Sequence, residues 1–314
     1  MADFDAIVVG SGCAGAVAAY ELAKAGKSTL VVERGNFAGA KNMTGGRIYS
    51  HSLKKVFPDF ESEAPLERKI THERIALMDP ASQTAIDFTS PELAEEGKDS
   101  YSVLRAPFDQ WLAERAEEAG ADFIYGIAVE DLIVRDGRVC GVVAGGDEVE
   151  ARITVLADGA NSLLAQKAGL ADDVPLPCQM AVGVKETIAL PPSVIEDRFL
   201  CAPGEGAAWM FAGDCTKGRV GGGFLYTNDD SISLGLVATL SDLAAGDVPI
   251  YQMLEDFKQR ADIAPLVKGG ELVEYSGHLV PEGGLAMVPR LYGDGVLVCG
   301  DAAMLCMNLG YSVR

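Results

Sequence analysis

The feature that most constrains this chain is a glycine-rich turn between an apolar run and a helix-like segment near its start. The apolar run 6–10 ends in the spacing Gly10-x-Gly12-x-x-Gly15, and a second apolar run after the helix ends on Glu33. Gly10 permits a tight turn, Gly12 lets backbone N–H groups approach a pyrophosphate, and Gly15 lets the helix pack closely on the strand. The N–H groups and dipole of a helix N-terminus favour negative charge at that point. The segment therefore predicts a dinucleotide-binding unit.

Glu33 narrows the choice of dinucleotide. It lies 18 positions after Gly15, where an acid accepts hydrogen bonds from the adenosine ribose hydroxyls. A carboxylate in this place repels a 2′-phosphate, so NADP is disfavoured. The spacing alone leaves NAD and FAD open, and a glycine-rich turn that serves only packing is the alternative.

The composition excludes several classes of protein. The formal charge is −20, from 46 acidic against 26 basic residues, and this sign disfavours binding to nucleic acid. No run of about 18 apolar residues appears, and the N-terminus lacks the basic and apolar segments of a secretory signal. We therefore expect a cytoplasmic protein of two domains, with peripheral contact at the inner face of the membrane at most.

Cysteine and histidine patterns give no sign of a metal site. The seven cysteines form no Cys-x-x-Cys pair, and the three histidines lie far apart in the sequence. Reduced thiols, with neither an iron–sulfur cluster nor a metal, are the expected state. No nucleophile motif or paired histidine and acid appears, so the sequence leaves any catalytic residue unknown.

Two further motifs stand at the ends of apolar strands. Asp158-Gly159 follows the strand 153–157, and Gly300-Asp301 follows a strand that begins near residue 295. Together with the N-terminal fingerprint, they resemble the flavoprotein group built on the aromatic-hydroxylase fold, which includes geranylgeranyl reductases. The resemblance implies FAD, with the Asp-Gly motif at the pyrophosphate and the Asp of the Gly-Asp motif on the ribityl hydroxyls. The alternative for both acids is that they cap helices.

A closer resemblance covers nearly the whole chain. The segments that carry it look like FixC-type proteins, the bacterial relatives of electron-transfer-flavoprotein:quinone oxidoreductase; they begin at Lys41, Ala181, Gly222, Ser231 and Pro281. This likeness implies electrons received from an electron-transfer flavoprotein and delivered to quinone or, through a separate ferredoxin-like iron–sulfur subunit, to a low-potential acceptor. Relatives of this type continue beyond the position of Arg314, so we expect a C-terminally truncated version. A prenyl reductase of the same fold and a flavin-free scaffold or folding fragment are the alternatives.

The expected architecture is α/β, α+β overall. It combines a Rossmann-like FAD-binding domain of the aromatic-hydroxylase type with a second, antiparallel-sheet substrate domain. We expect a short helix at 48–57, an exposed loop at 91–99 and a small β-meander within 122–144. The expected divisions are 1–66, 100–174 and 281–314 for the FAD-binding domain, 67–99 for a substrate-side hairpin insertion, and 175–280 for the substrate or acceptor domain.

The candidate cofactor-binding residues follow from the motifs and the resemblance. Lys41, beside the glycines of its loop, is expected to offset charge on the reduced flavin, and Arg105 matches the family's arginine before a cofactor-side helix, with a surface ion pair as its alternative. The last residues match a loop whose backbone meets the flavin ring. The full set is Gly10, Gly12, Cys13, Ala14, Gly15, Glu33, Arg34, Lys41, Asn42, Gly45, Gly46, Arg105, Val129, Asp158, Gly159, Gly300, Asp301, Gly310, Ser312 and Val313.

Overall fold

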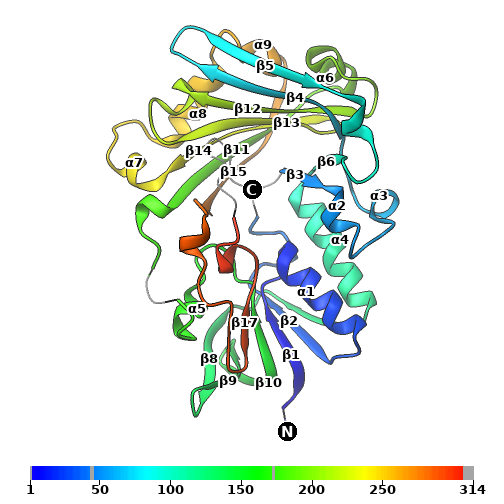
Figure 1. The fold of residues 1–314 in the computed structure, drawn as a ribbon, viewed down its shortest axis with the longest axis vertical. Coiled ribbons are helices and arrows are strands. Elements are labelled where there is room, and N and C mark those ends of the chain that lie inside the picture. Colours follow the sequence, from blue (N-terminus) through cyan, green and yellow to red (C-terminus); the bar gives the residue numbers. More distant parts are fainter. Residues whose placement is uncertain (1, 43–45, 172–173, 307–314) are drawn as a thin grey trace. The chain divides into compact units, whose positions relative to one another are not determined.

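The computed structural model describes residues 2–42, 46–171 and 174–306 (Figure 1). Contacts between Cα atoms divide them into two compact units. Unit 1 takes its described residues from Met1–Asn42, Ala106–Leu176 and Pro281–Met307, and unit 2 from Met43–Arg105 and Pro177–Val280.

Unit 1 is built on a mainly parallel sheet. Its strand order is β16-β17-β10-β1-β2-β7, and all neighbours from β17 to β7 are parallel. The strands are β1 (Phe4–Val9), β2 (Thr29–Glu33), β7 (Asp122–Tyr125), β10 (Asp147–Leu156), β16 (Tyr292–Gly293) and β17 (Val296–Val298). The five residues of β2 are all buried, as expected for a strand covered on both faces.

The two faces of this sheet carry different layers. Helix α1 (Cys13–Lys24) packs on β1 and β2, and its Ala19 and Ala23 share a core cluster with Ala116 of helix α4 (Arg105–Glu118). On the other face, residues of β8 (Val129–Arg135), β9 (Arg138–Ala144) and α5 (Leu163–Lys167) share a second cluster with the sheet. Short 3-10 turns follow at η4 (Leu285–Met287) and η5 (Gly300–Ala303).

Unit 2 contains a second sheet, in the order β15-β11-β14-β13-β12-β4-β6-β3, with β5 paired to β4. Most neighbours are antiparallel, but β12 and β4 run parallel. The strands are β3 (Gly46–Tyr49), β4 (Lys69–Met78), β5 (Gln83–Thr89), β6 (Ser100–Val103), β11 (Met180–Ala189), β12 (Glu205–Gly213), β13 (Gly221–Thr227), β14 (Ser231–Thr239) and β15 (Glu271–Pro281).

Helices cover one face of this second sheet. Met253, Leu254 and Phe257 of α8 are buried with Leu225 and Leu236 in the core of unit 2. The helices among the described residues of unit 2, whether or not they pack on this face, are α2 (Ser50–Leu53), α3 (Phe60–Glu63), α6 (Pro192–Phe199), α7 (Leu240–Ala244), α8 (Ile250–Lys258) and α9 (Ala264–Val267), and the 3-10 turns are η1 (Pro91–Ala94), η2 (Pro177–Gln179) and η3 (Asp214–Thr216). None of the helices in the described ranges is long and apolar enough to cross a membrane.

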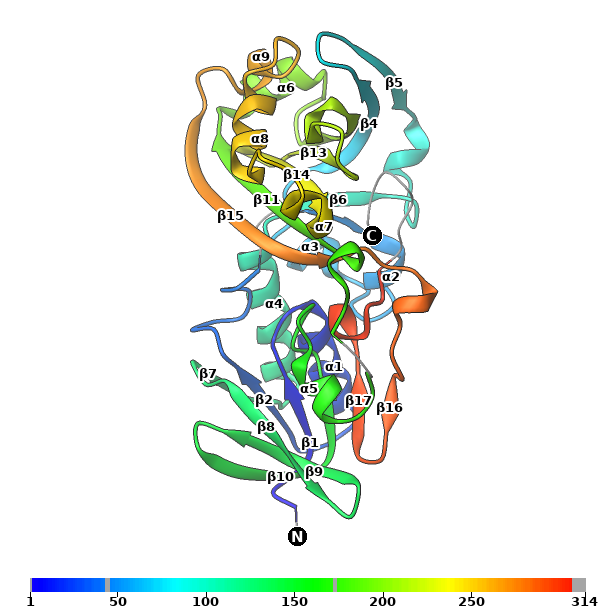
Figure 2. The same ribbon diagram turned by 90° about the vertical axis from the view of Figure 1, so that its left-hand side faces the viewer.

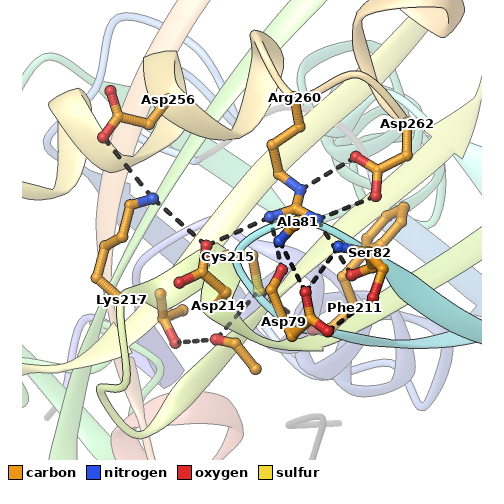
Figure 3. Close-up of polar contacts among 12 residues, drawn as sticks. Asp79, Ala81, Ser82, Phe211, Asp214, Cys215, Lys217, Asp256, Arg260 and Asp262 are labelled. Carbon is orange, nitrogen blue, oxygen red and sulfur yellow. Dashed lines mark hydrogen bonds and ion pairs between the residues drawn. The ribbon is translucent and has the colours of Figure 1, made fainter.

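An acid-rich cluster around Arg260 joins three segments of unit 2 (Figure 3). The Arg260 guanidinium pairs with both carboxylate oxygens of Asp262 at 3.0 Å, donates to the Asp79 carbonyl at 3.0 Å and contacts Asp214 at 3.3 Å. Beside it, burial raises the pKa of the Cys215 thiol to about 11. The contacts of Arg260 thus hold together three segments of unit 2 that lie far apart in the sequence.

Two local predictions are wrong, and a third holds except at its end. Residues 46–49 form a strand and only 50–53 a helix, because β3 pairs with β6. The segment expected as an exposed loop at 91–99 is exposed over most of its length, but its last residue, Asp99, is 2% exposed and accepts a hydrogen bond from the Ser50 hydroxyl. The strand at 122–125 pairs with β2 in the parallel sheet, so the meander consists of β8, β9 and the start of β10.

The contact-based units also divide the chain differently from the expected domains. Residues 46–66 lie in unit 2, although we expected them in the FAD-binding domain. The segment expected as a hairpin insertion contributes β4, which lies inside the sheet between β12 and β6. Residues 46–66 and 67–99 thus belong to one unit because strands from both segments lie in the same sheet. The second and third parts of the expected FAD-binding domain, from Ala106 and from Pro281, lie in unit 1.

Candidate functional site

The fingerprint forms a β1–turn–α1 unit whose glycines are required by close contacts. Gly10 has a φ of +98°, and a Cβ there would overlap the carbonyl oxygen of Ala157. A Cβ on Gly15 would overlap the carbonyl oxygen of Gly10. Gly12 precedes the helix in an extended conformation, and no described side chain caps the helix start. The first turn of α1 therefore presents backbone N–H groups suited to a diphosphate.

Sheet register brings the three motifs to one edge. Val9 pairs with Leu156, and Leu156 pairs with Val298, so β1, β10 and β17 end side by side. In open parallel sheets, ligands bind outside these carboxyl ends. A Cβ on Gly300 would lie 2.6 Å from the Cβ of Ala14, which places the Gly-Asp motif directly against the fingerprint helix.

Glu33 is engaged by the protein itself. Its buried carboxylate accepts hydrogen bonds from the Ser11 amide at 2.8 Å, the Ser11 hydroxyl at 3.1 Å and the Gly35 amide at 2.6 Å. These bonds tie the end of β2 to the fingerprint turn. A carboxylate has about four acceptor positions, so Glu33 can still accept the hydrogen bond that we predict from a ribose hydroxyl.

The two aspartates of the other motifs differ in environment. Burial raises the pKa of Asp158, while hydrogen bonds from the Ser162 hydroxyl and the Leu164 amide and the charge of Arg34 oppose that rise. Asp301 is exposed within η5, so its carboxylate is accessible to a ligand.

The remaining candidates fall into three groups. In unit 1, Arg34 and Lys41 are exposed, while Asn42 and Val129 are half-buried. In unit 2, Gly46 begins β3 with nothing within 4 Å of its Cβ position, and the half-buried Arg105 begins α4. The candidates outside the described residues are Gly45, Gly310, Ser312 and Val313.

A buried acid that the sequence analysis did not select links two of the candidates. Asp109 of α4 is 0% exposed. Its carboxylate accepts a hydrogen bond from the Cys13 thiol at 3.2 Å and another from the Asn42 side-chain amide. The position was recognisable, because an aspartate between the apolar Phe108 and Trp111 of one helix demands a polar partner. Asp109 thus fixes the loop that carries Lys41 to the start of α1.

We expect Asp109→Asn to weaken FAD binding about tenfold, which is about 1.4 kcal/mol. The variant replaces the charge-assisted hydrogen bond between Asn42 and the Asp109 carboxylate with a weaker contact between two neutral side-chain amides. To measure the effect, the flavin-depleted protein, or the protein refolded after unfolding, is titrated with FAD. Binding is followed by flavin fluorescence. The exchange variant Asp109→Asn/Asn42→Asp restores one donor and one acceptor, so it should recover most of the thermal stability that Asp109→Asn loses. Equal destabilisation in the single and exchange variants would contradict the pairing.

A buried amine in unit 2 gives a pH-dependent prediction. Lys185 of β11 is 0% exposed, and desolvation lowers its pKa to about 7, against a smaller opposing effect of Glu274. Between pH 7 and the unfolded-state pKa of 10.5 the unfolded chain binds more protons, so stability rises with pH in this window. We expect Lys185→Met to remove this rise. Denaturant unfolding at pH 7 and pH 9 measures it, and equal pH dependence in both proteins would contradict the assignment.

Comparisons with known proteins agree with this geometry. A family model described as FAD dependent oxidoreductase matches residues 5–107. The chain is 56% identical over 311 residues to Protein FixC of Escherichia coli (strain K12), covering 99% of this chain and 72% of that protein. It is 53% identical over 315 residues to the probable electron transfer flavoprotein-quinone oxidoreductase YdiS of the same organism, again with 99% and 72% coverage.

A solved structure shares the fold. The geranylgeranyl bacteriochlorophyll reductase-like protein Ta0516 of Thermoplasma acidophilum superimposes with a TM-score of 0.78 over 96% of this chain and 72% of that one. Its sequence identity of 22% supports the fold alone.

The residues present fit FAD. The uncapped start of α1 suits the diphosphate, the glycines leave no room for side chains where the motifs meet, and exposed Asp301 stands at the third strand end. Bound FAD supplies hydride and electron transfer. With this fit, the family match and the identity to FixC, the chain belongs to the FixC family of FAD-dependent oxidoreductases of electron transfer.

Proposed function

We propose that this protein receives electrons from an electron-transfer flavoprotein and passes them to quinone or, through a separate ferredoxin-like iron–sulfur subunit, to a low-potential acceptor. The observation that carries the proposal is the convergence of three FAD motifs in a chain 56% identical to FixC and 53% identical to a probable flavoprotein-quinone oxidoreductase. Any contact with a quinone-bearing membrane is proposed to be peripheral.

The protein's own groups bind and orient the cofactor. The first turn of α1 binds the diphosphate through backbone N–H groups, Glu33 accepts from the ribose, and Asp301 accepts from the ribityl hydroxyls. Lys41, held near the site by the bond between Asn42 and Asp109, offsets negative charge on the reduced flavin. No acid–base side chain is assigned. The flavin performs the redox chemistry, the protein sets its orientation, potential and access, and the two protons that a quinone takes up on reduction come from solvent.

The decisive experiment is anaerobic mixing of the FAD-loaded protein with a reduced electron-transfer flavoprotein. We expect the flavin of this protein to become reduced while the electron-transfer flavoprotein becomes oxidised, which is read from the oxidised-flavin band of each protein after anaerobic separation. The band of this protein should return when a water-soluble quinone analogue is added. Reoxidation of the reduced flavin by a ferredoxin-like protein, and not by the quinone analogue, would favour the route through the iron–sulfur subunit. Reoxidation by a geranylgeranyl substrate alone, or no reduction by any electron-transfer flavoprotein, would overturn the proposal.

A further inference from the structure

Strand β15 forms one edge of the sheet in unit 2 (Figure 2). It runs over Glu271–Pro281 and is the longest strand of that sheet, and among the described residues its hydrogen-bonded neighbour is β11. The outer edge of such a strand presents a row of backbone N–H and C=O groups that can pair with a further strand. The occupant that fits this edge is therefore another strand.

The side chains of β15 are unusually apolar for an edge strand. Leu272, Val273 and Tyr275 are 52%, 59% and 49% exposed. Edge strands are commonly protected by short length, by lysine or by proline. β15 has two acids but no lysine, and its one proline, Pro281, stands at the last position. An apolar edge of this kind is typical of a surface that another protein covers.

We propose that β15 pairs with β15 of a second copy of this chain, in the register that places Ser276 on the two-fold axis. Two copies that share one continuous antiparallel sheet are related by an axis perpendicular to it, so one residue faces its own counterpart. With Ser276 at the axis, Leu272 faces Val280 of the second copy and Val273 faces Leu279. Apolar side chains thus meet apolar side chains on both faces of the shared sheet.

The charges select the same register. With Ser276 at the axis, Glu274 faces His278 of the second copy, an acceptor opposite a donor, and the Tyr275 ring faces Gly277. Moving the axis to Glu274 would set that carboxylate against its own counterpart, which is unfavourable across a strand pair. Moving it to Tyr275 would set Leu272 against His278.

The Ser276 hydroxyl gives independent support. Its oxygen is buried and has no hydrogen-bond partner among the residues that the structure describes. At the axis, the same hydroxyl of the second copy lies directly across, where serine side chains can hydrogen-bond to each other. The paired stretch from Leu272 to Val280 also supplies about eight to ten backbone hydrogen bonds, close to the number in a typical specific interface.

Sedimentation equilibrium of the 314-residue chain tests the dimer, in about 0.5 M salt so that the −20 charge of each copy is screened. We expect a dimer. Val273→Lys should raise its dissociation constant about tenfold or more, because a cation replaces two apolar contacts per dimer. Ile86→Lys, at a 71% exposed position of β5 in the same sheet, is the matched control and should change nothing. A monomer, an unchanged dissociation constant in Val273→Lys, or a dimer weakened by Ile86→Lys would overturn the proposal.

Ser276→Cys tests the register. Facing residues of an antiparallel pair have Cα atoms about 4.5–5.5 Å apart, within disulfide range, so mild oxidation should link two copies at position 276. Leu272→Cys is the control, because its counterpart would lie about 27 Å along the strand. Peptide mass spectrometry separates this link from any through exposed Cys178. The absence of a link at position 276 would overturn the proposal. Neither experiment involves electron transfer, so the dimer can fail while the proposed function holds.

Discussion

Gly15→Ala is expected to abolish tight FAD binding. The added Cβ would overlap the carbonyl oxygen of Gly10 and lie 3.2 Å from the Cβ of Ala157. Both neighbours belong to the packed centre of the site, so α1 must move away from β1. Overpacking of this kind costs about 1–3 kcal/mol in stability. Displacement of the helix N-terminus should weaken FAD binding by about a hundredfold, or roughly 2.7 kcal/mol.

Flavin fluorescence titration and thermal unfolding measure these two effects. Gly277→Ala is the matched control, because its Cβ would meet its nearest neighbours at 3.5 Å, an ordinary contact distance. The control should bind FAD as the parent does. Parent-like FAD affinity in Gly15→Ala would show that the start of α1 is not where the diphosphate binds.

Arg68→Met is expected to cause the largest loss of stability in unit 2. Arg68 is 2% exposed. Its guanidinium donates to the carbonyls of Asn228 at 2.7 Å, Asp229 at 2.9 Å and Glu205 at 3.0 Å, and to the Glu196 carboxylate at 3.2 Å. Removing one partner of such a buried network leaves the others unsatisfied and costs about 3–5 kcal/mol. Arg68→Lys should recover only part, because an ammonium cannot reproduce the planar fork.

Chemical unfolding followed by tryptophan fluorescence suits this measurement, since Trp209 is buried in the core of unit 2. Arg135→Met is the control: Arg135 pairs with Glu150 at an exposed site of unit 1, where loss of an ion pair has little effect. An Arg68→Met protein with the parent's unfolding midpoint would show that the network contributes no net stability.

The predictions for Gly15 and Arg68 rest on different information, one on the sequence and the other on the tertiary structure. The role of Gly15 follows from a local pattern, because the fingerprint turn involves residues that are adjacent in sequence. No local sequence pattern identifies the role of Arg68, because the hydrogen-bond partners of its guanidinium lie 128 to 161 positions away. Only the pairing of β4 with distant strands shows why a charged side chain is buried there.

The sequence by itself determined the FAD-binding unit. Apolar runs next to the glycine fingerprint, the Asp-Gly motif and the Gly-Asp motif predicted β1, β10 and β17, and the helix-like segment and the apolar run that ends on Glu33 predicted α1 and β2. Each of these signals lies within a few consecutive residues. The resemblance to FixC-type proteins predicted the family, which the 56% identity confirms. The individual roles of the site residues stay predictions.

Only the tertiary structure decided how distant segments combine. It put β3 beside β6, made β4 an interior strand parallel to β12, and buried Asp99 and Asp109 among polar partners. It also left Leu297 uncovered on one face of a sheet whose other face is closed. Strand pairing and burial depend on contacts between residues far apart in the chain, and periodicity within one segment does not specify its neighbours.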